Sequence, residues 1–136
     1  MNDLTADLSS TPSIEARPLW PSDGPPSAKT AQRLCDLVAI ATAAAFALPV
    51  GELRAATRRP PYVAFARQSA MYLAHVTFGL NYSAVGPAFG RDRTTAARAC
   101  RLVEERRDDP AVDAVLGSLE GACGALRRRL SAPVRP

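Results

Sequence analysis

The stretch from Phe89 to Arg101 constrains the fold of this chain more than any other part of the sequence. Asp92 is a good N-cap for a helix, and Gly90, two residues earlier, suits a turn between two helices. Small apolar residues then recur at helical spacing, at Ala96, Ala99, Cys100 and Val103. Since each residue of a helix turns by about 100°, the residues that point away from this apolar face are Thr94, Arg98 and Arg101. The pattern predicts the turn and second helix of a helix-turn-helix.

The polar face of this helix has the chemistry that double-stranded DNA requires. Arginine can donate two hydrogen bonds to guanine O6 and N7, and threonine offers a hydroxyl group and a methyl group that contacts thymine. Recognition helices contact bases mainly through their N-terminal residues, which here are Arg93, Thr94 and Thr95. A surface helix with a solvated basic face has the same pattern, so this helix alone leaves both interpretations open.

The charge distribution favours a nucleic-acid partner. The chain has 136 residues and a formal net charge of +4. Between Arg54 and Arg101 there are eight arginines and one acidic residue, Asp92, which gives this segment a charge of +7 and leaves −3 for the remainder. A concentrated basic segment in a near-neutral chain is typical of nucleic-acid-binding proteins.

A second basic element precedes the helix-turn-helix. Pro60 and Pro61 hold the chain extended, so that a helix cannot begin before them. An extended arm with the paired Arg58 and Arg59 suits insertion into a narrow, negative minor groove. The alternative is a solvated basic loop.

Periodicity and capping residues predict an all-α helical bundle. We expect a disordered tail over residues 1–27, a helix-turn-helix DNA-binding domain over 28–131 and a disordered end over 132–136. The elements expected before the recognition helix are a helix over Ala28–Ala47 capped by Ser27, a helical turn over Val50–Ala56, a helix over Tyr62–Phe78 stopped by Gly79, and a short helix to Ala88 capped by Asn81 or Ser83.

A last helix is expected to begin at Pro110 and to pack across the bundle. Its apolar residues at helical spacing are Val112, Val115, Leu116, Leu119, Cys123 (or Ala122), Leu126 and Leu130. The polar segment Glu104–Asp109, which closes the recognition helix, is expected to point to solvent.

Two motifs carry a family resemblance. They are Arg67-Gln68-Ser69-Ala70-Met71 and Val85-Gly86 followed by Phe89-Gly90-Arg91-Asp92-Arg93-Thr94-Thr95. Roughly residues 32 to 130 resemble the C-terminal DNA-binding domain of the bacterial replication initiator DnaA, which implies a Trp-repressor-like helical bundle with a helix-turn-helix. The chain departs from the family pattern at three positions: Arg93 replaces a histidine that touches bases, Ala96 replaces a larger aliphatic residue, and Pro87 lies inside the first helix of the motif.

The resemblance implies a role for each candidate DNA contact. Arg67 matches a family residue that contacts phosphate, and Arg58 and Arg59 match a basic loop that enters the minor groove. We place Arg93, Thr94, Thr95 and Arg98 in the major groove. We place Arg67, Arg91 and Arg101 on phosphates. The complete predicted set is Arg58, Arg59, Arg67, Arg91, Asp92, Arg93, Thr94, Thr95, Arg98 and Arg101.

The sequence offers no pattern that indicates an enzyme, a cofactor or a metal site. Cys35, Cys100 and Cys123 are far apart, and His75 is the only histidine. DnaA proteins carry an ATPase module ahead of this domain, but the chain has no P-loop, so we expect a stand-alone copy of the DNA-reading domain. The longest uncharged run, Leu37–Gly51, is too short to cross a bilayer. We expect a cytoplasmic, nucleoid-associated protein without a membrane partner.

The leading hypothesis is a sequence-specific double-stranded DNA-binding protein that acts by site occupancy. Within it, a transcription regulator that binds DnaA-box-like sites comes first, and a modulator of replication initiation that competes with DnaA for its boxes comes second. A different class is a protein-interaction adaptor built on a former DNA-binding domain, whose tail near Trp20 recruits a protein partner. A third option is an architectural protein that coats DNA without sequence choice.

Overall fold

The computed structural model describes residues 26–55 and 59–131, and this part of the chain contains five α-helices, one short 3-10 helix and no strand. The elements are α2 (Ala28–Ala45), η1 (Val50–Arg54), α3 (Pro61–Val76), α4 (Tyr82–Ala88), α5 (Arg93–Arg106) and α6 (Pro110–Ser131). The predicted all-α bundle is therefore confirmed. Most of the tail predicted over residues 1–27, the end predicted over 132–136 and Arg58 lie outside the described residues.

Local capping residues set where the helices begin. The Ser27 hydroxyl accepts a hydrogen bond from the backbone N–H of Thr30 at 3.1 Å, at the start of α2. Pro61 is the first residue of α3, where its missing N–H leaves no hydrogen bond unmade. Asn81, and not Ser83, caps α4, because its side chain accepts from the N–H of Ala84 at 2.9 Å.

Two helices end two residues earlier than predicted. Ala47 has a φ of 55°, a left-handed conformation that cannot continue a helix, so α2 ends at Ala45 rather than at Ala47. Helix α3 ends at Val76 rather than at Phe78, because Gly79 has a φ of 69° and the N–H of Leu80 bonds back to the carbonyl of Ala74 at 3.3 Å. The N–H of Gly79 itself donates to the carbonyl of His75 at 3.1 Å, which is the usual bond by which a left-handed glycine closes a helix.

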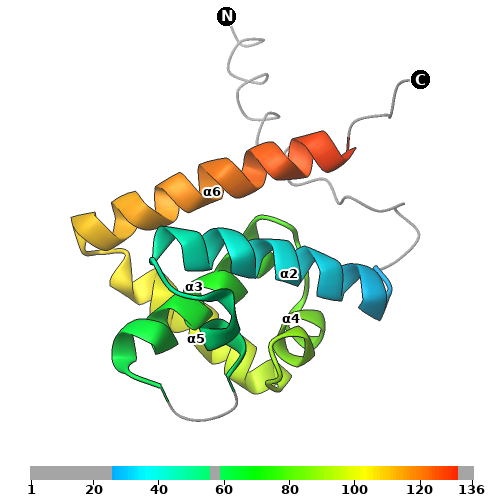
Figure 1. Ribbon diagram of the computed structural model, residues 1–136, viewed down its shortest axis with the longest axis horizontal. Helices are drawn as coiled ribbons and strands as arrows, with labels where there is room; N and C mark the ends of the chain where they lie inside the picture. Colours follow the sequence, from blue (N-terminus) through cyan, green and yellow to red (C-terminus); the bar gives the residue numbers. More distant parts are fainter. Residues whose placement is uncertain (1–25, 56–58, 132–136) are drawn as a thin grey trace, which may run out of the picture.

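Helices α2 and α3 pack together at the centre of the bundle (Figure 1). Helix α3 also packs against α5, and α2 against α4, so the helix-turn-helix formed by α4 and α5 is supported from behind by both central helices. Helix α6 crosses α2 on the side of the bundle away from α4 (Figure 1). The largest fully buried side chains come from all of these elements and from η1, and they include Leu53, Met71, Leu73, Phe78, Leu80, Phe89 and Leu116.

Helix α6 packs across the bundle as expected, but through a narrower apolar stripe than the sequence suggested. Leu116, Leu119 and Cys123 are buried, and Val112 and Leu126 are partly buried against them. Val115 and Leu130 remain 41% and 48% exposed, so their assignment to the packed face was wrong. Val115 comes three residues after Val112 and is therefore about a sixth of a turn away from it around the helix axis, at the solvent edge of the stripe.

Candidate nucleic-acid interface

The turn between α4 and α5 depends on two glycines. Gly90 has a φ of 70°, a left-handed conformation that favours glycine. Gly86 lies against the start of α5: a Cβ atom at this position would be 2.5 Å from the carbonyl oxygen of Asp92 and 2.6 Å from its carbonyl carbon. The N–H of Arg91 donates to the carbonyl of Gly86 at 2.8 Å. The first turn of α5 therefore rests directly on the backbone of α4.

Two of the three departures from the family pattern, Pro87 and Ala96, affect the packing of the helix-turn-helix, and both are accommodated. Pro87 is exposed, and α4 continues through it to Ala88. It stands at the penultimate position of this short helix, where only one intrahelical N–H donor is lost. Ala96 is fully buried on the inner side of α5, which lets this helix approach its neighbours closely.

Asp92 caps the recognition helix α5, as predicted. Its carboxylate accepts a hydrogen bond from the backbone N–H of Thr95 at 2.7 Å. This bond, with a second one from the Thr95 hydroxyl, lowers the pKa of the Asp92 carboxyl below its ordinary value of 3.8. Asp92 thus orders the turn that carries the predicted base-contacting residues.

The two faces of α5 separate as the periodicity predicted. The inner face is buried and consists of Ala96, Ala99, Cys100 and Val103. The outer face is open to solvent and carries Arg93, Thr94, Thr95, Arg98 and Arg101. Within the described part of the chain, none of these three arginines forms a hydrogen bond or ion pair with the protein. Their guanidinium groups are free to meet an anionic ligand.

Arg67 belongs to α3 and lies close enough to Arg91 for their charges to interact. Its side chain is half-buried, and its Nε and Nη1 atoms are buried without a hydrogen-bond acceptor in the described residues. Burial lowers the pKa of the Arg67 guanidinium, and the positive charge of Arg91 lowers it further. A guanidinium with unsatisfied donors beside a second arginine fits an incoming oxyanion such as a DNA phosphate.

Arg91 holds the turn to a distant part of the chain. Its Nη2 atom donates to the backbone carbonyl of Ala55 at 3.1 Å, and its Nη1 atom lies 3.3 Å from the carbonyl of Phe89 and 3.4 Å from that of Gly90. Arg91 was predicted to bind phosphate only; its bond to Ala55 was not predicted, since the two residues are 36 positions apart in the sequence.

Arg54 makes a contact in the opposite direction, from η1 to the end of α4, and this contact was also not predicted from the sequence. Its Nη1 atom donates to the carbonyl of Ala88, the last residue of α4, at 2.6 Å, and its Nη2 atom pairs with Asp36 on α2. Gln32 donates to the same Ala88 carbonyl at 3.2 Å and to Asp36 at 3.0 Å. The Arg54 guanidinium carbon also lies 5.1 Å from the centre of the Phe89 ring. Arg54 therefore points into the protein, although it belongs to the basic segment.

Of the predicted minor-groove arm, Arg58 lies outside the described residues and Arg59 is half-buried. The Nε atom of Arg59 pairs with Glu52 of η1 at 2.9 Å. Arg59 is therefore held against η1 and is not a freely solvated side chain.

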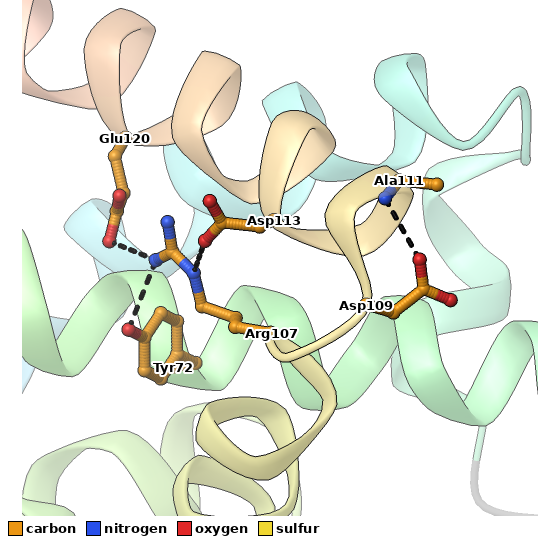
Figure 2. A network of polar contacts seen from close by, with 6 residues as sticks. All are labelled: Tyr72, Arg107, Asp109, Ala111, Asp113 and Glu120. Atoms are coloured by element: carbon orange, nitrogen blue, oxygen red, sulfur yellow. Dashed lines mark hydrogen bonds and ion pairs between the residues drawn. The ribbon is translucent and has the colours of Figure 1, made fainter.

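Arg107, just after α5, connects three helices (Figure 2). Its Nη1 atom donates to Glu120 on α6 at 2.7 Å and to the hydroxyl of Tyr72 on α3 at 3.2 Å, and its Nε atom pairs with Asp113 at 2.6 Å. These bonds, chiefly the one to Glu120, raise the pKa of the Arg107 guanidinium. The expectation that the whole Glu104–Asp109 segment points to solvent was wrong at this residue, because its partners on α3 and α6 are distant in sequence.

Among the described residues, no helix is long and apolar enough to cross a membrane. This same part of the chain contains no group of three or more His, Cys, Asp or Glu side chains placed to hold a metal ion.

One comparison with known proteins gives a match that covers this region of the chain. A family model described as the bacterial dnaA protein helix-turn-helix matches residues 35–103, about half of the chain. The matched region includes η1, α3, α4 and the exposed face of α5, so every predicted DNA contact lies within it. No curated protein matches the chain.

Proposed function

The chain belongs to the bacterial DnaA helix-turn-helix family, a family of DNA-binding domains, and we propose that it acts by occupying specific double-stranded DNA sites. Its role would be transcription regulation: a bound copy blocks or recruits other proteins at a promoter, without a catalytic step of its own. We place its sites among DnaA-box-like sequences, modified where Arg93 replaces the family histidine.

The observation that carries this proposal is the outer face of α5. Arg93, Arg98 and Arg101 are exposed there and have no partner among residues 26–55 and 59–131, and the opposite side of the same helix is buried in the core. A major groove is wide enough to admit an α-helix, and it presents guanine acceptors to arginine and thymine methyl groups to threonine. We assign base contacts to Arg93, Thr94, Thr95 and Arg98.

The surrounding residues supply the backbone contacts in this proposal. Arg67, Arg91 and Arg101 bind phosphates beside the groove, and Arg58 with Arg59 follows the adjacent minor groove. Arg59 would exchange its ion pair with Glu52 for DNA contacts, so this assignment involves a change of partner on binding. Asp92 contributes through the helix cap rather than as a donor to phosphate.

Selection of bound sequences from a random duplex pool tests the proposal. A regulator selects one consensus, and we expect guanine at the position read by Arg93. If the consensus equals the initiator's own box, competition with DnaA at replication origins becomes the better interpretation. Salt-sensitive binding with no consensus would indicate an architectural protein, and no binding at all would indicate the protein-interaction adaptor.

The salt dependence of the affinity provides an independent check. Each neutralised phosphate contributes about −0.9 to the slope of log affinity against log salt. If about five arginines meet phosphates, the slope measured by fluorescence anisotropy on the selected duplex should be about −4 to −5. A slope near zero would contradict a DNA-binding role for the basic segment.

A further inference from the structure

Two side-chain bonds run in opposite directions between η1 and the turn of the helix-turn-helix. Arg54 at the end of η1 donates to the carbonyl of Ala88 at 2.6 Å, and Arg91 in the turn donates to the carbonyl of Ala55 at 3.1 Å. We call this reciprocal pair of bonds the clasp. The clasp joins residues 54–55 to residues 88–91, which are separated by more than thirty positions in the sequence.

The acceptor of the bond from Arg54 is the carbonyl of Ala88, at the C-terminal end of α4. The last carbonyls of a helix have no partner within that helix and need donors from elsewhere. Ala88 ends α4, and its carbonyl receives both Arg54 and Gln32, which share Asp36 as their second acceptor. The charge of Arg54 is therefore balanced by the neighbouring Asp36, in a pair whose two side chains are both partly exposed.

The position of the clasp links the two predicted DNA-contacting elements. Ala55 directly follows η1, and Arg59, the first described residue beyond it, is tied back to η1 through Glu52. The other half of the clasp lies at Arg91, two residues before α5 begins. The clasp thus fixes the place from which the basic arm leaves η1 relative to the N-terminal end of the recognition helix.

We propose that Arg54, supported by Asp36, is a positioning residue for DNA recognition, and that Arg91 acts with it. Neither Arg54 nor Asp36 contacts DNA. Together they hold Ala55, after which the arm begins, at a fixed place relative to the start of α5, so that the arm and α5 can enter adjacent grooves of one duplex at once. When two DNA-contacting elements are held rigidly in one protein, binding of the first brings the second to its groove at a high effective concentration. This gain in affinity is lost when the two elements can move relative to each other. This inference rests on the proposed DNA-binding function.

The first test uses a substitution for which simple electrostatics predicts the opposite result. Asp36→Ala removes a negative charge and introduces a better helix former, so charge alone would leave affinity for the selected duplex unchanged or improve it. Loss of the clasp should instead weaken binding by about three- to tenfold. Asp108→Ala is the matched control, because it removes the same charge from an exposed side chain that has no partner in the described part of the chain. The control should bind at least as tightly as the wild-type protein.

The second test measures whether the two grooves are coupled. In the selected duplex, replacing adenines on the arm side with 2,6-diaminopurine adds an amino group to the minor groove and leaves the major-groove edge of adenine intact. We expect this change to weaken wild-type binding by about tenfold and to weaken Arg54→Met binding by no more than about twofold, because the arm is no longer held in place. Arg106→Met, which removes an arginine that lies over the Phe65 ring at 4.0 Å, should retain the wild-type sensitivity.

The outcomes separate this proposal from the proposed function. Each affinity is calculated from the concentration of active, folded protein. Circular dichroism checks the folding of each variant, and stoichiometric titration gives its active concentration. If Asp36→Ala binds as tightly as Asp108→Ala, or if diaminopurine weakens Arg54→Met and wild-type protein by the same factor, the clasp has no positioning role while DNA binding stands. If diaminopurine has no effect on wild-type binding, the arm makes no minor-groove contact and the proposal fails. If the wild-type protein selects no duplex, the proposed function itself fails.

Discussion

Arg67 illustrates at the scale of one residue how a binding site can be prepared in the absence of its ligand. Two of its guanidinium nitrogens are buried without an acceptor in the described residues, and burial lowers the pKa of the group. A buried donor without a partner destabilises the folded state. A phosphate oxygen placed against Arg67 would remove that penalty, so the unfavourable contact in the free protein becomes a favourable one in the complex.

We predict that Arg67→Met lowers DNA affinity but does not lower the stability of the free protein. The methionine keeps an apolar stem and removes the unsatisfied donors, so the thermal midpoint without DNA should stay the same or rise. The affinity should fall on all duplexes alike, and the salt slope should become shallower by about 1. Thermal unfolding and anisotropy titrations measure both effects. A clear loss of stability with an unchanged salt slope would show that Arg67 is a structural residue only.

Arg93 is the residue expected to set the difference from the family's usual site. It is exposed on the first turn of α5 and has no protein partner in the described residues. Arg93→Ala should cost about 1–3 kcal/mol of binding free energy and relax selectivity at one base pair. Arg106→Ala, at the other end of the same helix, is the control and should leave the base preference unchanged. An unchanged consensus in Arg93→Ala would mean that this arginine does not read sequence.

At the scale of the structural element, the packing of α4 against α5 depends on the absence of one side chain. A Cβ at Gly86 would lie 2.5 Å from a backbone oxygen of Asp92, which cannot move without displacing the start of α5. Gly86→Ala should therefore reduce the free energy of unfolding by about 1–3 kcal/mol and weaken DNA binding as well.

Gly117→Ala on α6 is the matched control for Gly86→Ala. No atom of the described residues would lie within 4 Å of a Cβ at Gly117, so alanine should stabilise the helix by about 0.5–1 kcal/mol without changing DNA affinity. Urea unfolding of both variants gives the comparison. Equal effects of the two substitutions would contradict the close approach of α4 and α5.

The cap of α5 should make part of the stability depend on pH. The pKa of the Asp92 carboxyl is lowered in the folded protein by hydrogen bonds from Thr95. The ionised carboxylate therefore adds stability that is fully present above its ordinary pKa of 3.8 and is lost as pH falls through the lower folded-state pKa. Asparagine caps helices equally well without titrating in this range. The thermal midpoint of wild-type protein minus that of Asp92→Asn should fall as the pH is lowered from about 6 to about 2. A constant difference would show that the Asp92 charge does not stabilise the cap.

At the scale of the whole molecule, local signals were sufficient to predict most of the fold. Ser27, Pro61, Asn81, Asp92 and Pro110 each act on the backbone within a few residues of themselves, so their effect on helix starts can be recognised in one sequence. The apolar face of α5 was predicted for the same reason, because its residues lie on one helix.

The partners of the arginines could not be predicted in this way. Arg54, Arg91 and Arg107 all belong to polar or basic stretches, yet each directs its guanidinium to groups brought close only by the tertiary fold. Nothing in the local sequence separates them from Arg93 or Arg98, which stay exposed. The close contact between Gly86 and Asp92 could be suspected from the local sequence, because a glycine inside a short helix lowers helix stability and often marks a close approach of two backbones.

Mapping the DNA-contacting surface on the intact protein tests the central claim most directly. Backbone amide signals of isotope-labelled protein are followed by nuclear magnetic resonance as the selected duplex is added. We predict that the largest changes fall on residues 91–101 and on Arg67, and that residues 114–126 of α6, on the other side of the bundle, change little. Unchanged signals over residues 91–101, with the largest changes on α6, would contradict the assignment of the outer face of α5 as the surface that reads DNA.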